Sequence, residues 1–193
     1  MTALFDSHCH VDEEKFDQDR DAVLQRMAEN GVTRMAVVGS DMATSAHGVA
    51  FAAEHPGCVG VVGIHPHVAK GFREADLQHL ADWYTSGQAK AIGEIGLDYY
   101  YDFSPRQVQR EVCEAQIELA YTLGAPAVFH IRDAHGDMLA LFRSRRSRLP
   151  RGIIHCYSGS WESAKEYLDM GFYISFAGPV TFKKAPHLQQ TAM

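Results

Sequence analysis

The chain repeats one pattern seven times: a short run rich in Val, Ile and Ala, followed by a segment with helical spacing. Continuous apolar runs of this length are typical of strands buried on both faces of a parallel sheet. The alternation predicts an α/β fold, either an open doubly wound sheet or a (β/α)8 barrel. The predicted strands cover residues 3–7, 34–39, 58–64, 90–95, 126–131, 152–155 and 172–176.

The clearest predicted helix covers residues 104–123. Ser104 is predicted to cap its amino end, with Pro105 at the first helical position and Gln107 completing a capping box. Gly124 is predicted to end it. Its apolar stripe, predicted to face the sheet, consists of Val108, Val112, Ala115, Leu119 and Leu123. A second helix is predicted at 19–30, and no linker divides the chain, so we expect one domain, 1–193.

The predicted strands end in polar residues of one chemical kind. An open sheet would normally carry a glycine-rich phosphate loop after its first strand, but this chain has histidines there. On an extended strand, His8 and His10 point to the same face. Parallel strands bring their carboxyl ends to one rim, where imidazoles and a carboxylate together form the ligand set of a divalent metal site. The other strand-end candidates are His65, His67, Glu94, His130 and His155.

Composition narrows the function classes. The net charge of −6 argues against a protein that coats nucleic acid non-specifically. No apolar run approaches the roughly 18 residues of a membrane span, and no signal peptide is evident, so we expect a cytoplasmic protein. The four cysteines lack paired spacing and are interpreted as reduced thiols. No feature requires an obligate protein partner.

Six motifs, in order along nearly the whole chain, make it similar to one known family. They are DSHCH at 6–10, GIHPH at 63–67, GEIGLDYY at 93–100, HIR at 130–132, HCYSG at 155–159 and GPVTFK at 178–183. With these motifs the chain resembles the TatD-type metal-dependent deoxyribonucleases, within the wider amidohydrolase-like barrels. The resemblance implies a TIM-type (β/α) barrel, of which this chain contains seven of the eight strand–helix units.

The resemblance also implies roles for single residues. His8 and His10 would bind a first divalent metal ion, and Glu94 would bridge it to a second. His130 and His155 would complete the second site. The candidates for contacts with substrate phosphate are His65, Arg132 and Lys183. Two further residues, Asp98 and Tyr99, are expected to shape the rim of the pocket. Magnesium, manganese, zinc, iron and nickel all remain open as the metal.

One motif of the family is absent. Members carry a further aspartate at the end of the eighth strand, within a motif resembling Glu-Thr-Asp-x-Pro-Tyr, whereas this chain stops at Met193, inside a helix predicted at 185–192. We therefore expect a C-terminally incomplete barrel with unpaired apolar edges on its first and seventh strands. Such an aspartate can act as general base. We expect this polypeptide, made alone, to be poorly soluble or feebly active.

Three functions follow from this sequence. The leading interpretation is a metal-dependent hydrolase of DNA phosphodiester bonds, acting as a 3′–5′ exonuclease. The second keeps the metal site but takes a small-molecule amide, ester or phosphoester, since barrels host many chemistries. The third is an inactive truncated barrel that serves as a binding module. The basic run at 143–148 is the one candidate DNA-binding surface, but it leads into the amino end of a strand and is more typical of a solvated helix end.

Overall fold

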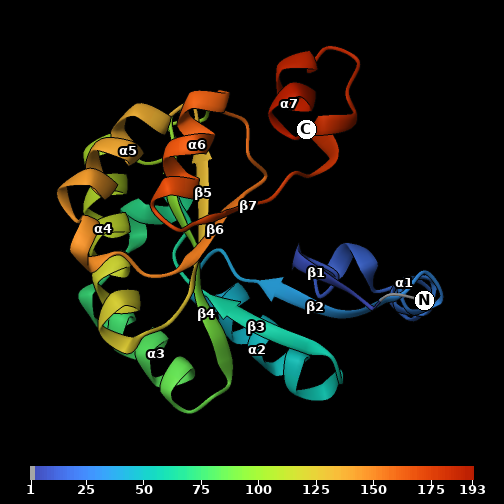
Figure 1. Ribbon diagram of the computed structural model, residues 1–193. Helices are drawn as coiled ribbons and strands as arrows, with labels where there is room; N and C mark the ends of the chain where they lie inside the picture. The colour runs from blue at the N-terminus through green and yellow to red at the C-terminus, as the bar shows by residue number, and fades with distance from the viewer. Residues whose placement is uncertain (1–2) are drawn as a thin grey trace.

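The computed structural model describes residues 3–193 and contains one sheet of seven parallel strands in the order β1-β2-β3-β4-β5-β6-β7 (Figure 1). This arrangement confirms the predicted TIM-type α/β architecture with seven strand–helix units. The strands are β1 (Leu4–Cys9), β2 (Val32–Val38), β3 (Cys58–Val62), β4 (Ala89–Asp98), β5 (Ala127–Arg132), β6 (Gly152–His155) and β7 (Tyr173–Ile174).

Helices connect successive strands, as parallel pairing requires. Figure 1 shows a strongly curled sheet with α3, α4, α5 and α6 together on one side, while α7 stands apart near the last strand. No helix within residues 3–193 is both long and apolar enough to cross a membrane. The helices are α1 (Arg20–Glu29), α2 (Met42–Glu54), α3 (Glu74–Thr85), α4 (Arg106–Leu123), α5 (His135–Ser144), α6 (Trp161–Asp169) and α7 (Pro186–Thr191), with short 3-10 turns η1 (Glu14–Phe16), η2 (Pro66–Gly71), η3 (Arg146–Arg148) and η4 (Gly178–Thr181).

The two outer strands each pair on one side only within the described chain. β1 pairs with β2, and β7 pairs with β6. β7 is only two residues long, whereas the predicted strand at 172–176 has five. Large apolar side chains are exposed on both strands: Leu4 and Phe5 on β1, and Tyr173 on β7. These are the unpaired apolar edges that the sequence predicts.

The core lies where β4 and β5 meet α4 and α5. Every residue of β4 except Lys90 is buried, so the strand is covered on both faces, as its apolar sequence predicts. Ile92 and Ile95 of β4, Phe129 of β5 and Ile117 of α4 are fully buried in the main apolar cluster. β4 and β5 therefore lie in the most buried part of the sheet.

Two glycines beside Glu94 allow β4 to pass unusually close to β5. Gly96 has a φ of +146°, and a Cβ there would lie 1.9 Å from the carbonyl oxygen of His130. A Cβ on Gly93 would lie 2.7 Å from the Cβ of Val128. Only glycine fits such an approach without moving the neighbouring strand. The glycines thereby determine how near Glu94 and His130 lie to each other.

The predicted capping of α4 is wrong, although Gly124, with a φ of 65°, does end the helix. α4 begins at Arg106 and has no side-chain cap. The Ser104 hydroxyl instead accepts a hydrogen bond from the Lys70 N–H and donates one to the His67 carbonyl, both at 3.0 Å. Ser104 therefore joins the segments after β3 and β4.

The buried face of α4 differs from the predicted stripe, of which only Val112 is buried, and it includes two glutamines that hold strand ends. Gln109 accepts a hydrogen bond from the Asp98 N–H at 2.8 Å and donates to the Asp98 carbonyl at 3.1 Å. Gln116 makes the same pair of bonds with Ile64, at 2.8 and 3.0 Å. Buried backbone groups at a strand end need such partners. α4 thus fixes the carboxyl ends of β3 and β4.

We predict that Gln109→Leu destabilises the protein, because the buried N–H and carbonyl of Asp98 lose their partners. An unsatisfied buried polar group costs about 1–3 kcal/mol, so we expect the free energy of unfolding to fall by about 2 kcal/mol or more. Urea unfolding followed by circular dichroism measures this. Gln107→Leu is the matched control, since Gln107 is exposed on the same helix and, within residues 3–193, its side chain hydrogen-bonds only to Glu111. Equal stability of the two variants would contradict the role of Gln109.

Candidate metal centre

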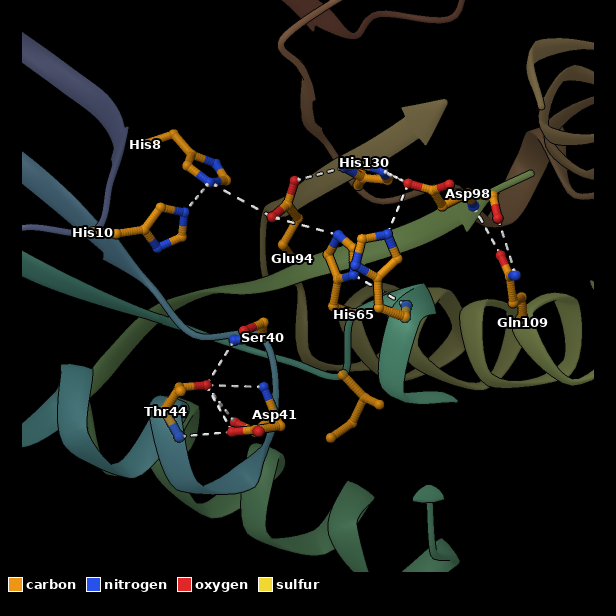
Figure 2. Close-up of polar contacts among 12 residues, drawn as sticks. His8, His10, Ser40, Asp41, Thr44, His65, Glu94, Asp98, Gln109 and His130 are labelled. Atoms are coloured by element: carbon orange, nitrogen blue, oxygen red, sulfur yellow. Dashed lines mark hydrogen bonds and ion pairs between the residues drawn. The ribbon is translucent and has the colours of Figure 1, made fainter. Parts of the chain in front are cut away.

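The first group of candidate ligands gathers at the carboxyl end of β1. The Nε2 atoms of His8 and His10 lie 3.2 Å apart, and Glu94 Oε2 lies 3.6 Å from His8 Nε2 (Figure 2). Donor atoms of these three residues all lie within 4.8 Å of one another. The two imidazoles share one face of the strand end, as the alternation of side chains predicts. The arrangement leaves three donors directed at one small volume.

Glu94 also reaches a second group through its other oxygen. Glu94 Oε1 lies 3.2 Å from His130 Nδ1, on β5. His130 Nε2 lies 2.8 Å from Asp98 Oδ2 (Figure 2). Metal-binding histidines usually donate their second ring N–H to a carboxylate, which fixes the ring and its tautomer. His130 has this geometry, with Nδ1 facing Glu94 and Nε2 held by Asp98.

Asp98 does more than shape the rim, the role that the resemblance implies for it. Its side chain is fully buried, and Oδ2 also lies 2.9 Å from His67 Nε2. Oδ1 accepts backbone hydrogen bonds from Tyr100 at 3.0 Å and Tyr101 at 2.8 Å. One carboxylate therefore orients two histidines and fixes the turn after β4. The spacing of Glu94, Gly96 and Asp98 could have indicated this role, because alternate residues of a strand share a face and Asp98 therefore lies on the same face as Glu94.

A second donor group consists of His65, His67 and His130, whose ligand atoms also lie within 4.8 Å of one another. His67 is a strand-end candidate for which the sequence predicts no separate role. His65 Nδ1 accepts a hydrogen bond from the His67 N–H at 3.1 Å, so in the neutral ring the proton sits on Nε2. His65 Nε2 lies 3.9 Å from Glu94 Oε2. His65 therefore presents an N–H donor to the centre.

Burial and mutual contacts set the charges. Burial lowers the pKa of His8 and of His65 to about 3, so both rings are neutral near pH 7. Burial alone would raise the pKa of Glu94, but the hydrogen bond from His130 and the nearby histidines hold it well below its usual range. Burial opposes the protonation of His130, but bonds to Asp98 and Glu94 outweigh it and raise its pKa to about 9.

A divalent cation fits this donor set. Neutral imidazoles offer lone pairs, and the ionised Glu94 carboxylate offers one oxygen to each histidine group. Imidazole nitrogen and carboxylate oxygen are the ligand types found in zinc, manganese, iron and nickel sites. The buried atom His8 Nδ1 has no hydrogen-bond partner within residues 3–193, which leaves this ring held by packing.

The remaining predicted site residues differ in whether they contact the histidine groups. His155 stacks on His8 with ring centroids 3.5 Å apart, and burial lowers its pKa. The Arg132 guanidinium lies over the Tyr100 ring at 4.0 Å and forms no ion pair within the described chain. Lys183 is exposed between η4 and α7, and among residues 3–193 it makes no hydrogen bond or ion pair with the histidine groups. The structure therefore brings the His155 ring against His8 and, within the described residues, shows no polar contact between Lys183 and the histidine groups.

The basic run at 143–148 is held by acidic side chains of neighbouring helices. Arg143 binds Glu166 of α6, with Nε–Oε1 at 2.5 Å. Arg145 binds Glu114 of α4 at 3.0 Å, and Arg148 binds Glu118. These ion pairs agree with the interpretation of the run as a helix end rather than a DNA-binding surface.

Comparison with known proteins places this architecture in one family. The family model described as TatD related DNase matches residues 5–193. The chain is 38% identical over 182 residues to the metal-dependent hydrolase YabD of Bacillus subtilis, covering 94% of this chain and 71% of YabD. It is 33% identical over 175 residues to a protein of Cronobacter sakazakii named 3′-5′ ssDNA/RNA exonuclease TatD, covering 91% of this chain and 66% of that protein.

A solved structure agrees with these matches. The crystal structure of YjjV, a TatD homologue from Escherichia coli K12, superposes with a TM-score of 0.89 at 26% identity, covering 97% of this chain and 73% of YjjV. The chain thus spans about two thirds to three quarters of the length of the relatives it matches. The prediction of a TatD-type metal-dependent hydrolase is confirmed at this level. The chain belongs to the TatD-related DNase family.

Proposed function

We propose that this metal-dependent hydrolase cleaves phosphodiester bonds of DNA from a 3′ end, through a centre that holds two divalent ions. The observation that carries the proposal is the placement of Glu94. One of its oxygens faces His8, and the other faces His130. A carboxylate placed in this way is suited to bridge two ions. The name of the Cronobacter relative, a 3′-5′ ssDNA/RNA exonuclease, supports the choice of substrate and polarity.

In this proposal His8, His10 and Glu94 hold one ion, and Glu94, His130 and His155 hold the other. When bound, such ions supply a hydroxide nucleophile at neutral pH and neutralise the charge that develops on the phosphate. The described residues would hold the ions through neutral imidazoles, because burial lowers the pKa values of His8 and His155. Asp98 would keep the Nδ1 atom of His130 directed at Glu94.

His65 is the best-supported contact for the substrate phosphate among the three candidates. Its Nε2–H points toward Glu94 and cannot accept, because Nδ1 is already an acceptor for the His67 N–H. Such a fixed donor can bind a phosphate oxygen and stabilise the charge that develops there. Arg132 lies at the same end of the sheet, at the last residue of β5. Lys183 stays a candidate by resemblance alone.

We predict that Glu94→Ala abolishes metal-dependent hydrolysis, because both ions lose their shared ligand. Changing an outer residue of a metal site typically costs 10- to 100-fold, so removing a ligand is expected to cost more than about 100-fold in kcat/KM. Manganese-dependent cleavage of single-stranded DNA labelled at either end measures rate and polarity together. Glu29→Ala is the control, since Glu29 is exposed and, in the part of the chain that the structure describes, its side chain hydrogen-bonds only to Gln25.

Turnover by the Glu94→Ala variant at the unaltered rate would refute the assignment of the centre. Parallel assays with a small phosphodiester, an ester and an amide address the alternative of a small-molecule hydrolase. Cleavage of an amide but not of DNA would favour that alternative. A chain that takes up no divalent ion would favour the binding module.

We predict that metal binding at His130 releases a proton at neutral pH. The pKa of His130 is raised to about 9 in the metal-free protein, so its ring is protonated at pH 7, yet a ligand nitrogen must be unprotonated. The apparent affinity is therefore expected to rise with pH, by about tenfold per unit between pH 7 and 8.5. Manganese titrations by calorimetry in buffers of different ionisation enthalpy report both affinity and proton release.

The matched variant is His130→Gln, which removes the titrating ring. We expect it to release about one proton fewer per bound ion than the parent chain. Affinity independent of pH, with no buffer-dependent heat in the parent chain, would show that His130 Nδ1 is not a ligand.

A further inference from the structure

Three exposed aromatic side chains follow β4 at the rim of the candidate centre. Tyr100, Tyr101 and Phe103 are 58%, 46% and 55% exposed; we call them the aromatic rim. The rings of Tyr101 and Phe103 are stacked, with centroids 5.1 Å apart and planes 24° apart. Tyr100 lies perpendicular to Tyr101 at 4.8 Å. Large apolar side chains gathered at the surface in this way indicate a binding site rather than core packing.

The aromatic rim directly borders the histidine groups. The His67 ring lies 5.3 Å from Tyr101 and 5.0 Å from Phe103, centroid to centroid. The backbone N–H groups of Tyr100 and Tyr101 both bind Asp98 Oδ1, while Oδ2 of the same carboxylate contacts His67 and His130. One buried anchor therefore fixes both the centre and the rim. A group bound at the centre would have the rim as its immediate neighbour.

Arg132 adds a cation to the aromatic rim. Its guanidinium carbon lies 4.0 Å from the centroid of the Tyr100 ring and 4.9 Å from that of Tyr101. The side chain is partly exposed and forms no ion pair within residues 3–193, so its charge is not neutralised by a carboxylate. Aromatic faces combined with an arginine are the means by which proteins bind single-stranded nucleic acid without strong sequence preference.

We propose that the aromatic rim and Arg132 form a stacking platform for the bases next to the phosphate bound at the metal centre. This inference rests on the proposed function and deepens it by naming the residues that hold the bases of the strand. Bases can stack on the rim only when they are unpaired and splayed from their neighbours. Every base has an aromatic face, so the platform tolerates any sequence.

A protein partner is the competing occupant, since tyrosine, phenylalanine and arginine are also enriched in protein interfaces. Two observations favour nucleic acid. The rim contacts the ring of His67, in the group that borders Glu94, and the charge of Arg132 is complementary to a phosphate backbone.

Binding of a fluorescein-labelled single-stranded oligonucleotide, followed by anisotropy in EDTA, tests the platform without any need for turnover. Base–aromatic stacking is worth about 5- to 100-fold in affinity, so we expect Tyr101→Ala and Phe103→Ala each to raise the dissociation constant by that factor. Tyr101→Phe keeps the ring and is expected to bind like the parent chain. Tyr173→Ala is the matched control, because Tyr173 is 73% exposed on β7.

The discriminating comparison uses an oligonucleotide with abasic sites at its last two 3′ positions. We expect the parent chain to bind it about 5- to 100-fold more weakly than the intact strand. The Tyr101→Ala variant should distinguish the two strands less or not at all. Because the Asp98 anchor uses the backbone of Tyr101, loss of the side chain is expected to leave the melting temperature within a few degrees, which circular dichroism checks.

Equal affinity for intact, abasic and double-stranded oligonucleotides would overturn the platform. So would a loss of self-association in Tyr101→Ala, by analytical ultracentrifugation, with no change in DNA binding, since the rim would then be a protein interface. The two proposals fail separately. If the chain hydrolyses a small phosphodiester but its DNA binding does not depend on the aromatic rim, only the platform is refuted. If its DNA binding depends on the rim but it hydrolyses no substrate, only the hydrolytic function is refuted.

Discussion

The buried carboxylate of Glu94 is the charge on which the site depends. Burying an ionised carboxylate is costly unless opposite charge and hydrogen bonds compensate. In this chain His130 supplies the compensation within the protein, and Asp98 in turn balances His130. The glycines at 93 and 96 make the arrangement possible, because any side chain there would push β4 away from β5. Electrostatics and backbone sterics therefore both favour a short distance between Glu94 on β4 and His130 on β5.

The scaffold around this charge is held by polar contacts rather than by apolar packing alone. Gln109 and Gln116 fix the last residues of two strands through their backbones, and Ser104 ties together the segments that follow those strands. Each of these groups is fully buried, so each bond forms where water cannot compete. Positions a few tenths of an ångström apart decide whether ligands converge, and directional bonds control such positions better than apolar contacts do.

Sequence reasoning identified the parts of the site that depend on local periodicity. Strand alternation and the shared rim of parallel strands were sufficient to find His8, His10 and Glu94, which the structure brings together. The same reasoning named His67 without giving it a role and expected Asp98 only to shape the rim, because the roles of both depend on contacts across 31 and 32 positions of sequence.

The wrong prediction for the start of α4 also results from contacts between residues far apart in the sequence. A serine before a proline is a typical helix cap. The Ser104 hydroxyl instead hydrogen-bonds to the backbone of Lys70 and His67 and does not cap the helix. The buried glutamines of α4 likewise lie outside the predicted apolar stripe, because they bind backbone groups at the end of β4 and just after β3. Patterns of polarity predict which face of an element is covered, but they cannot show which backbone groups on the neighbouring element lack partners.

Asp98 links the chemistry of the centre to the shape of its surroundings. Its Oδ2 atom orients His67 and His130. Its Oδ1 atom fixes the turn that carries Tyr100 and Tyr101. A displacement of this carboxylate would therefore move ligand nitrogens and rim rings together. In the proposed function, such coupling would tie the position of a bound base to the position of the phosphate beside it. An exonuclease of the kind we propose needs this relation, since each new terminal nucleotide must take up the same geometry before its bond can be cleaved.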